Sequence, residues 1–275
     1  MRVARRDRLH YDGAMTRLAW AVVVVVLAGA PALHVAAIDI DTAKVIDLSH
    51  GFGPETIYWP AAKHFTLEEV SKGDVGGHWY EANNFCAAEH GGTHMDAPAH
   101  FARGGATTDR VPVTAGIGPL VKVDVHAQAD QNPDYRLTAD DLHTWERANG
   151  PIPRGAIVVM DSGWAARWPD PQRYLGTAAA GDTANLHFPG FSREAVEFLV
   201  HERDINAIGV DTPSIDYGPS QDFIVHQILN GANKPGFENL ANLARVPPHG
   251  ATLIALPMKI EGGSGGPVRA IALLP

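Results

Sequence analysis

The sequence predicts a mixed α/β fold in a single domain, and three observations carry that prediction. Short apolar segments alternate with turn residues from residue 43 onward. Residues 156–211 have the order strand, long loop, helix and strand, which is typical of a parallel crossover unit. Hydrophobic residues make up 45% of the 275 positions and charged residues 19%, which suits a globular chain with a core and excludes a disordered one.

The individual elements follow from local signals along the chain. The predicted strands cover residues 45–48, 120–125, 156–160, 205–210, 252–256 and 268–274. The predicted helices cover residues 138–148, 192–202 and 220–229. Thr138 and Asp141 stand at the N-cap and capping-box positions of the first helix, and Ser192 caps the second. The glycine-rich residues 262–266 lack the Lys-Ser/Thr pair of a phosphate-binding loop, so we interpret them as a tight turn between strands.

The N-terminal residues 1–37 differ from the rest of the chain. Arginines precede an almost entirely apolar stretch over 18–30, and small residues follow it, which is the order of a secretory signal peptide. The apolar stretch is shorter than the ~20 residues of a membrane-spanning helix, and Pro31 interrupts it. We therefore expect a secreted or periplasmic protein with one domain over 38–275 and no stable membrane partner. An uncleaved segment would instead be a membrane anchor, and Met15 is an alternative start.

Charge and cysteine content restrict the function further. The formal net charge is −9 and no basic cluster follows residue 17, which argues against nucleic-acid binding. The single cysteine, Cys86, excludes an intrachain disulfide, and we expect it to be a small buried apolar residue. Asp211 follows a predicted strand and could serve either a functional site or a turn. The 14 histidines are the less ordinary count, since histidine binds metals and carries protons near neutral pH.

Residues 90–101, His-Gly-Gly-Thr-His-Met-Asp-Ala-Pro-Ala-His-Phe, are the densest cluster of chemically versatile side chains. The two glycines and the proline exclude the helical His-Glu-x-x-His site of zinc proteases. In extended chain His94 and Asp96 point to the same face, and the glycines allow His90 to reach the same point. Two imidazoles and a carboxylate suit Zn²⁺ or Mn²⁺, whereas the alternative is a set of surface or satisfied core histidines. His100 lies further along and could stand beside the metal.

This segment resembles the pattern His-x-Gly-Thr-His-x-Asp-x-Pro-x-His-Phe of the cyclase / metal-dependent arylformamidase family, which includes bacterial kynurenine formamidases and isatin hydrolases. The resemblance extends over most of residues 44–274. Shorter similar segments lie at 45–49, 58–60, 209–214 and 266–269. The resemblance implies a layered β/β/α (swivelling-type) domain with mixed sheets. It also implies homo-oligomers, commonly dimers.

The resemblance implies a site that holds one or two divalent ions, Zn or Mn. By position the metal ligands would be His90, His94, Asp96, His226 and Glu238. Asp96 could bridge two ions, His100 would be the acid/base, and Trp59 would pack against an aromatic substrate. Without the resemblance, His226 would be interpreted as a half-exposed helix residue and Glu238 as a charge at a helix N-terminus.

The implied function is the divalent-metal-dependent hydrolysis of a small aromatic amide. The substrate could be an open amide such as N-formylkynurenine, an intermediate of tryptophan catabolism, or a cyclic amide such as isatin. In either case the ion would activate water, and His100 would pass a proton to the leaving nitrogen. Two alternatives stay open at this point. One is a lactone or cyclic-ester hydrolase with the same site, and the other is a non-catalytic periplasmic protein that binds metal or a small ligand.

Overall fold

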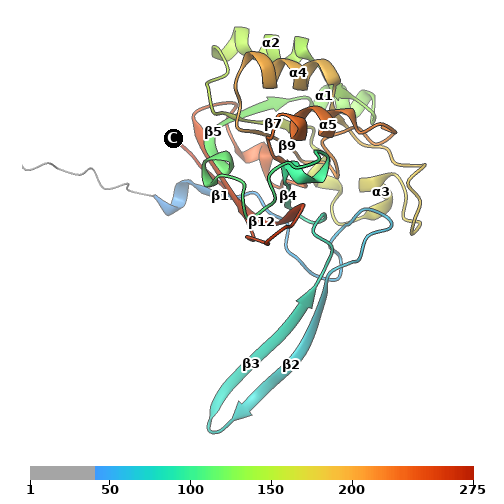
Figure 1. The fold of residues 1–275 in the computed structure, drawn as a ribbon, viewed down its shortest axis with the longest axis vertical. Helices are drawn as coiled ribbons and strands as arrows, with labels where there is room; N and C mark the ends of the chain where they lie inside the picture. Colours follow the sequence, from blue (N-terminus) through green and yellow to red (C-terminus); the bar gives the residue numbers. More distant parts are fainter. Residues whose placement is uncertain (1–40) are drawn as a thin grey trace, which may run out of the picture. The chain divides into compact units, whose positions relative to one another are not determined.

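Eight strands form one mixed sheet that closes on itself (Figure 1). The computed structural model describes residues 41–275, so the predicted signal segment over 1–37 lies outside the described residues. In spatial order the strands are β1 (Val45–Asp47), β12 (Gly265–Leu273), β11 (Ala251–Pro257), β5 (Ile117–Asp124), β7 (Ile157–Asp161), β9 (Ala207–Val210), β10 (Gly236–Glu238) and β4 (His94–Asp96). Strand β4 pairs with both β10 and β12, which closes the sheet into a barrel-like arrangement.

The sheet combines parallel and antiparallel pairs. Strands β5, β7, β9 and β10 are parallel neighbours, and the remaining pairs are antiparallel. The step from β7 to β9 passes through a long loop and the helix α4 (Arg193–Glu202), as the sequence predicts. The mixed α/β class is therefore confirmed.

Alternate residues of the central strands divide between two hydrophobic cores. In β7, Val158 and Met160 pack under the helices α2 (Ala139–Asn149), α4 and α5 (Ile224–Gly231), which cover one face of the sheet. Ile157 and Val159 point instead into the interior that the closed sheet surrounds. The period of two in a strand explains this division, because successive side chains face opposite sides. The result is a layer of helices packed on a sheet that has its own core.

Capping side chains fix where the helices begin. Thr138 and Asp141 form the predicted capping box of α2, with the Thr138 amide donating to the Asp141 carboxylate at 2.7 Å. Ser192 caps α4 as predicted. Helix α5 begins at Ile224, four residues later than expected, because Phe223 adopts a left-handed backbone with φ of 48°. Within residues 41–275, no helix combines the length and apolar character that a membrane-spanning helix needs.

A long hairpin, which the sequence does not predict, forms a separate two-stranded sheet that projects away from the rest of the domain in Figure 1. Its strands are β2 (Thr66–Val75) and β3 (His78–Cys86), and most of their residues are exposed. Cys86 ends β3 and is exposed, so the expectation of a buried cysteine is wrong. Smaller elements complete the fold: α1 (His126–Gln131), α3 (Pro171–Leu175), the strand pair β6 (Arg136–Leu137) and β8 (Gly190–Phe191), and 3-10 turns at Thr42–Lys44, Pro98–His100, Val113–Gly116, Trp164–Arg167 and Leu243–Arg245.

Candidate metal centre

Strand β4 and the loop before it position three of the predicted ligands. His94 and Asp96 stand at the two ends of β4 and are 2% and 1% exposed. Gly91 and Gly92 bring the preceding loop back over the strand, so that His90 reaches Asp96. Gly92 has φ of +57°, and a Cβ on Gly91 would lie 2.0 Å from the Tyr58 ring, so this path requires glycine.

The register of the sheet and the start of α5 add the other two predicted ligands. Glu238 on β10 lies directly opposite His94 on β4 in the antiparallel pair. His226 lies in the first turn of α5 and is 3% exposed, rather than half-exposed as its sequence context suggested. The structure therefore brings together the five residues His90, His94, Asp96, His226 and Glu238, which we call the ligand cluster.

Asp96 is at the centre of the ligand cluster. Its Oδ1 lies 2.6 Å from His90 Nδ1 and 3.2 Å from His94 Nε2, and its Oδ2 lies 3.1 Å from His226 Nε2. Glu238 approaches from the opposite strand, with Oε2 at 3.4 Å from His94 Nε2 and Oε1 at 3.3 Å from His226 Nε2. Two carboxylates thus face three imidazole nitrogens inside the protein.

Hydrogen bonds on the outer side of two histidines indicate which ring nitrogen carries hydrogen. His226 Nδ1 lies 2.6 Å from Asp216 Oδ2, and His94 Nδ1 lies 3.0 Å from the Gly92 carbonyl oxygen. Both partners can only accept, so in each ring Nδ1–H donates. The Nε2 lone pair of each ring then points at the carboxylates of the ligand cluster. This is the outer arrangement that orients metal-binding histidines in proteins.

His90 is oriented by a longer chain of hydrogen bonds. Ser264 donates its hydroxyl hydrogen to Glu89 Oε2 at 2.7 Å, so its oxygen accepts from His90 Nε2–H at 2.9 Å. The Nδ1 lone pair of His90 therefore faces Asp96. Ser264 belongs to the glycine-rich segment that the sequence analysis interpreted only as a turn, and Glu89 directly precedes His90. Asp216, Ser264 and Glu89 are the functional residues that sequence reasoning missed.

The donor set fits a cation. Three imidazole lone pairs and two carboxylates converge, and among the described residues His94 Nε2 is buried without a hydrogen-bond partner. Lone pairs that face carboxylates in a buried site repel each other unless positive charge lies between them. Nitrogen and carboxylate ligands in this number suit Zn²⁺ or Mn²⁺. Two groups of potential ligand atoms, each with its atoms within 4.8 Å of one another, have Asp96 in common. One also contains His90 and His94, and the other contains His100 and His226.

The pKa values of the ligand cluster also show that the site favours positive charge. Burial lowers the pKa of His94, but Asp96 and Glu238 outweigh it and raise the pKa to about 9. Burial also lowers the pKa of His226, but Asp216 first, and then Asp96 and Glu238, outweigh it and raise the pKa. Burial raises the pKa of Asp96, yet the neighbouring His226, His90 and His94 hold the pKa well below its ordinary value. Burial and the neighbouring Asp96 charge raise the pKa of Glu238. A divalent ion would replace the protons that this site otherwise attracts.

His100 lies beside the ligand cluster. Its ring stacks on His90 with centroids 3.8 Å apart, and it is 5.7 Å from the His226 ring. Burial lowers the pKa of His100 to about 4, which leaves the ring neutral near pH 7 and able to accept a proton. One ring nitrogen lies within 4.8 Å of ligand atoms of Asp96 and His226, so the geometry is compatible both with a neighbouring acid/base and with a further ligand.

An aromatic cavity of about 270 Å³ opens onto the ligand cluster. Trp59, Tyr58, Phe101 and Phe223 line it together with His100. The Trp59 and Phe223 rings have centroids 6.1 Å apart, and those of Phe101 and Phe223 are 5.5 Å apart. A small cavity with aromatic walls and polar groups at one end suits a planar aromatic ligand. The structure therefore places Trp59 in the same cavity as the predicted ligands.

Asp211, for which the sequence left two roles open, does not line this cavity. Its carboxylate accepts hydrogen bonds from the Ser162 amide and hydroxyl and from the Trp164 amide at 2.6–3.1 Å. Burial raises the pKa of Asp211 to about 6. These contacts fix the turn after β7, so Asp211 holds local structure.

Comparison with known proteins gives consistent matches over most of the chain. A family model described as "Putative cyclase" matches residues 46–217. An isatin hydrolase from Roseibium aggregatum is 33% identical over 247 residues, which cover 84% of this chain and 92% of that protein. A kynurenine formamidase from Salinibacter ruber is 28% identical over 230 residues, covering 82% of this chain and 96% of that protein. The solved structure of isatin hydrolase A from Ralstonia solanacearum has a TM-score of 0.77 at 36% identity, covering 84% of this chain and 92% of that chain.

Proposed function

This chain belongs to the cyclase family of hydrolases, and from that premise we propose that it hydrolyses a small aromatic amide with a divalent metal ion held by the ligand cluster. The observation that carries this proposal is the convergence of three imidazole lone pairs and two carboxylates at the end of an aromatic cavity. Two of its relatives are named isatin hydrolase and kynurenine formamidase.

Different residues of the site would have different roles in the hydrolysis. A divalent ion, Zn²⁺ or Mn²⁺, bound at the ligand cluster supplies a Lewis acid and an activated water at neutral pH. His100 is neutral at that pH, so a ring nitrogen accepts a proton from the attacking water and returns it to the leaving nitrogen. Trp59 and Phe223 hold the aromatic ring of the substrate beside the cluster. An aromatic amine nitrogen leaves more readily than an alkyl amine, which suits this single-histidine arrangement.

Within this class we propose a cyclic aryl amide of the isatin type, with the open N-formylkynurenine type as the second candidate. The isatin hydrolases from Roseibium aggregatum and Ralstonia solanacearum are 33% and 36% identical to this chain, and kynurenine formamidases are 28% and 30% identical. Both substrates carry a carbonyl joined to an aryl nitrogen, so the same residues could act on either. The shape of the cavity beside Trp59 decides between them.

The test is an ultraviolet assay of the metal-loaded protein on isatin, N-formylkynurenine and an aromatic lactone. We expect turnover of one aryl amide that is lost in His94→Ala and unchanged in the surface control Asp134→Asn. Turnover of the lactone alone would replace the amide assignment with an ester one. Metal uptake without turnover of any of the three would identify a binding protein and contradict the proposal.

We also propose that the chain is exported and acts as a homodimer. Residues 1–37 have the composition of a leader, and cleavage after them would leave a domain over 38–275. The hairpin β2–β3 carries six exposed large hydrophobic side chains, which are Leu67, Val70, Val75, Trp79, Tyr80 and Phe85. Exposed apolar surface of this kind is typical of a contact with another chain. Light scattering on the purified protein and N-terminal sequencing of the exported form test the two proposals, and a monomer or an intact leader would contradict them.

A further inference from the structure

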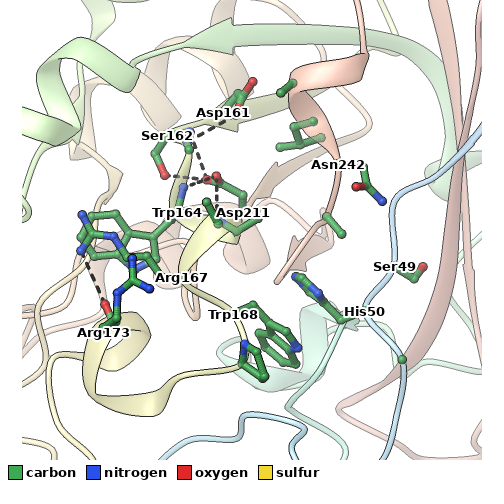
Figure 2. Close-up of a pocket in the computed structure, with 18 of the residues that line it drawn as sticks. Ser49, His50, Asp161, Ser162, Trp164, Arg167, Trp168, Arg173, Asp211 and Asn242 are labelled. Carbon is green, nitrogen blue, oxygen red and sulfur yellow. Dashed lines mark hydrogen bonds between the residues drawn. The ribbon is translucent and has the colours of Figure 1, made fainter.

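A second cavity of about 1010 Å³ lies in the domain and shares no lining residue with the aromatic cavity at the ligand cluster. Three segments form most of it, namely residues 49–56, residues 161–169 after β7 and residues 241–244, and the separate residues His126, Asp130, Arg173 and Asp211 complete the lining (Figure 2). Nothing in the proposed reaction uses these segments. The size of the cavity is at the upper end of the range for small-molecule sites. We call it the arginine cavity, after Arg167 and Arg173 in its wall.

Neither of these two arginines forms a salt bridge in the described part of the chain. Arg167 lies over the Trp164 ring, with Cζ 3.3 Å from the ring centroid, and makes one long hydrogen bond, 3.5 Å, to the Arg173 carbonyl oxygen. Among residues 41–275 neither guanidinium has a carboxylate oxygen within 4 Å. Burial and the charge of Arg173 lower the pKa of Arg167, and they outweigh the carboxylates of Asp130 and Asp211, which raise it. Two neighbouring positive charges on one cavity wall that form no salt bridge with the described carboxylates favour a bound anion.

The carboxylates of the arginine cavity are either engaged or too far away to serve as that anion. Asp161 pairs with Lys122 and His126 at 3.1 and 2.8 Å. The Asp211 carboxylate accepts hydrogen bonds from the amides and the hydroxyl that follow β7. Glu55 and Asp130 line the cavity but are exposed, and each lies more than 4 Å from both guanidinium groups.

Aromatic side chains also line the arginine cavity. Trp168 stacks on His50 with ring centroids 4.1 Å apart and 11° between the planes. Burial lowers the pKa of His50 to about 4, so the ring is uncharged near neutral pH, and its Nε2 atom is buried without a partner among the described residues. Figure 2 shows this stacked pair and the two arginines around the same opening. The wall thus combines two guanidinium groups with flat, uncharged rings.

We propose that the arginine cavity binds a small aromatic monocarboxylate. The carboxylate would lie between Arg167 and Arg173, because a guanidinium pairs with carboxylate through two parallel hydrogen bonds. The aromatic ring would lie against the face formed by Trp168 and His50. The proposal does not depend on amide hydrolysis. If the proposed function also holds, opening a cyclic aryl amide yields an aromatic carboxylate, so the reaction product belongs to this ligand class.

Hydrogen bonds connect the wall of the arginine cavity to the ligand cluster. The His50 amide donates to Thr93 Oγ1 at 2.8 Å, and Thr93, which precedes His94, donates to the Asn239 carbonyl at 2.7 Å. The Tyr174 hydroxyl contacts both the Asp211 carbonyl and the Asn239 side chain at 2.9 Å. Asn239 follows Glu238 directly. The wall of the arginine cavity is thus joined by hydrogen bonds to the segments that hold His94 and Glu238.

The test is calorimetric titration of the purified full chain with benzoate, with benzamide as the uncharged comparison. We expect benzoate to bind, benzamide to bind at least about tenfold more weakly, and Arg173→Gln to weaken benzoate by at least about tenfold. Arg173 is exposed on α3, so this variant should fold, and its hydrolysis rate without benzoate should be unchanged. Arg154→Gln is the matched control, because Arg154 is exposed, pairs with Asp204 and lies outside the cavity.

Benzoate could instead bind a metal ion at the ligand cluster, and His94→Ala separates the two sites. We expect His94→Ala to keep benzoate binding even where hydrolysis is lost. Loss of benzoate binding in His94→Ala, equal binding in Arg173→Gln, or no binding at millimolar benzoate would each overturn the proposal. Failure of the amide hydrolysis assay would leave this binding result unaffected, so the two proposals fail separately.

Discussion

Replacing Asp216 by Asn tests the orientation of the ligand cluster without changing any predicted ligand. Asp216 is 1% exposed and accepts from the Ser220 hydroxyl at 3.4 Å and from three groups in the first turn of α5. Its Oδ2 accepts from the His226 amide at 3.1 Å and from His226 Nδ1–H at 2.6 Å, and its Oδ1 accepts from the Val225 amide at 3.0 Å. An asparagine has only one accepting oxygen. The side-chain NH2 group of the asparagine must therefore face either His226 or the Val225 amide. Because both of these are donors as well, two donors then face each other without an acceptor.

The size of the effect follows from these contacts. With the Asn nitrogen toward His226, Nδ1 must accept, so the imidazole carries its hydrogen on Nε2. Metal binding needs the lone pair on Nε2 instead. Loss of such an outer partner typically lowers metal affinity about 10- to 100-fold, or about 1.4–2.8 kcal/mol. One unsatisfied buried amide also lowers the free energy of unfolding by about 1–3 kcal/mol. Asp216→Asn should therefore fold, bind metal weakly, and recover part of its activity at high metal concentration.

The assay is competition for the metal with a chelator of known affinity, with circular dichroism to confirm folding. Asp134→Asn is the matched control, because Asp134 contacts His187 Nδ1 at 2.9 Å in the same kind of pair, on an exposed surface. We expect the control to match the unmodified protein. Equal metal affinity in folded Asp216→Asn and in the control would refute the reasoning that His226 binds metal through Nε2.

Three further predictions concern the neighbouring groups. His100→Ala should lower kcat about 10²–10⁴-fold with the metal content unchanged, and metal loss in elemental analysis would make His100 a ligand instead. Trp59→Ala should raise KM about tenfold with little change in kcat in steady-state assays, since it removes aromatic contact with the substrate, whereas a fall in kcat alone would contradict that role. The folded-state pKa of His50 is about 4, below its unfolded value of 6.5, so its contribution to stability is complete above pH 6.5 and lost as pH falls toward 4. Urea unfolding at pH 7 and pH 5 should show a loss of stability that is smaller in His50→Asn by up to about 2 kcal/mol, and equal losses in both proteins would exclude this effect.

Local signals predicted most of the sheet and its helices. The crossover from β7 through α4 to β9 was predicted because β7 and β9 are continuous apolar segments and Ser192 is a residue typical of a helix N-cap. The hairpin over residues 66–86 was missed because neither face packs on a core, and the period-two signal arises from one-sided burial. The late start of α5 was missed because Asp216, outside the helix, accepts its first amides.

The ligand cluster was predicted in two ways. His90, His94 and Asp96 follow from spacing within one segment, whereas His226 and Glu238 required the resemblance to a family, which is now confirmed. Spacing alone could not join Glu238 to His94, because that contact depends on the register of two three-residue strands. The outer partners Ser264 and Glu89 were out of reach for the same reason, since 175 positions separate them in the chain.

Counting the metal ions in the purified protein tests the central claim most directly. Elemental analysis of the protein, with aryl amide hydrolysis measured on the same sample before and after chelation, needs no variant. The account predicts one or two divalent ions per chain, loss of hydrolysis together with the ions, and recovery when Zn²⁺ or Mn²⁺ is returned. Full hydrolysis by a chain that contains no divalent ion would contradict the claim that the ligand cluster is a metal centre.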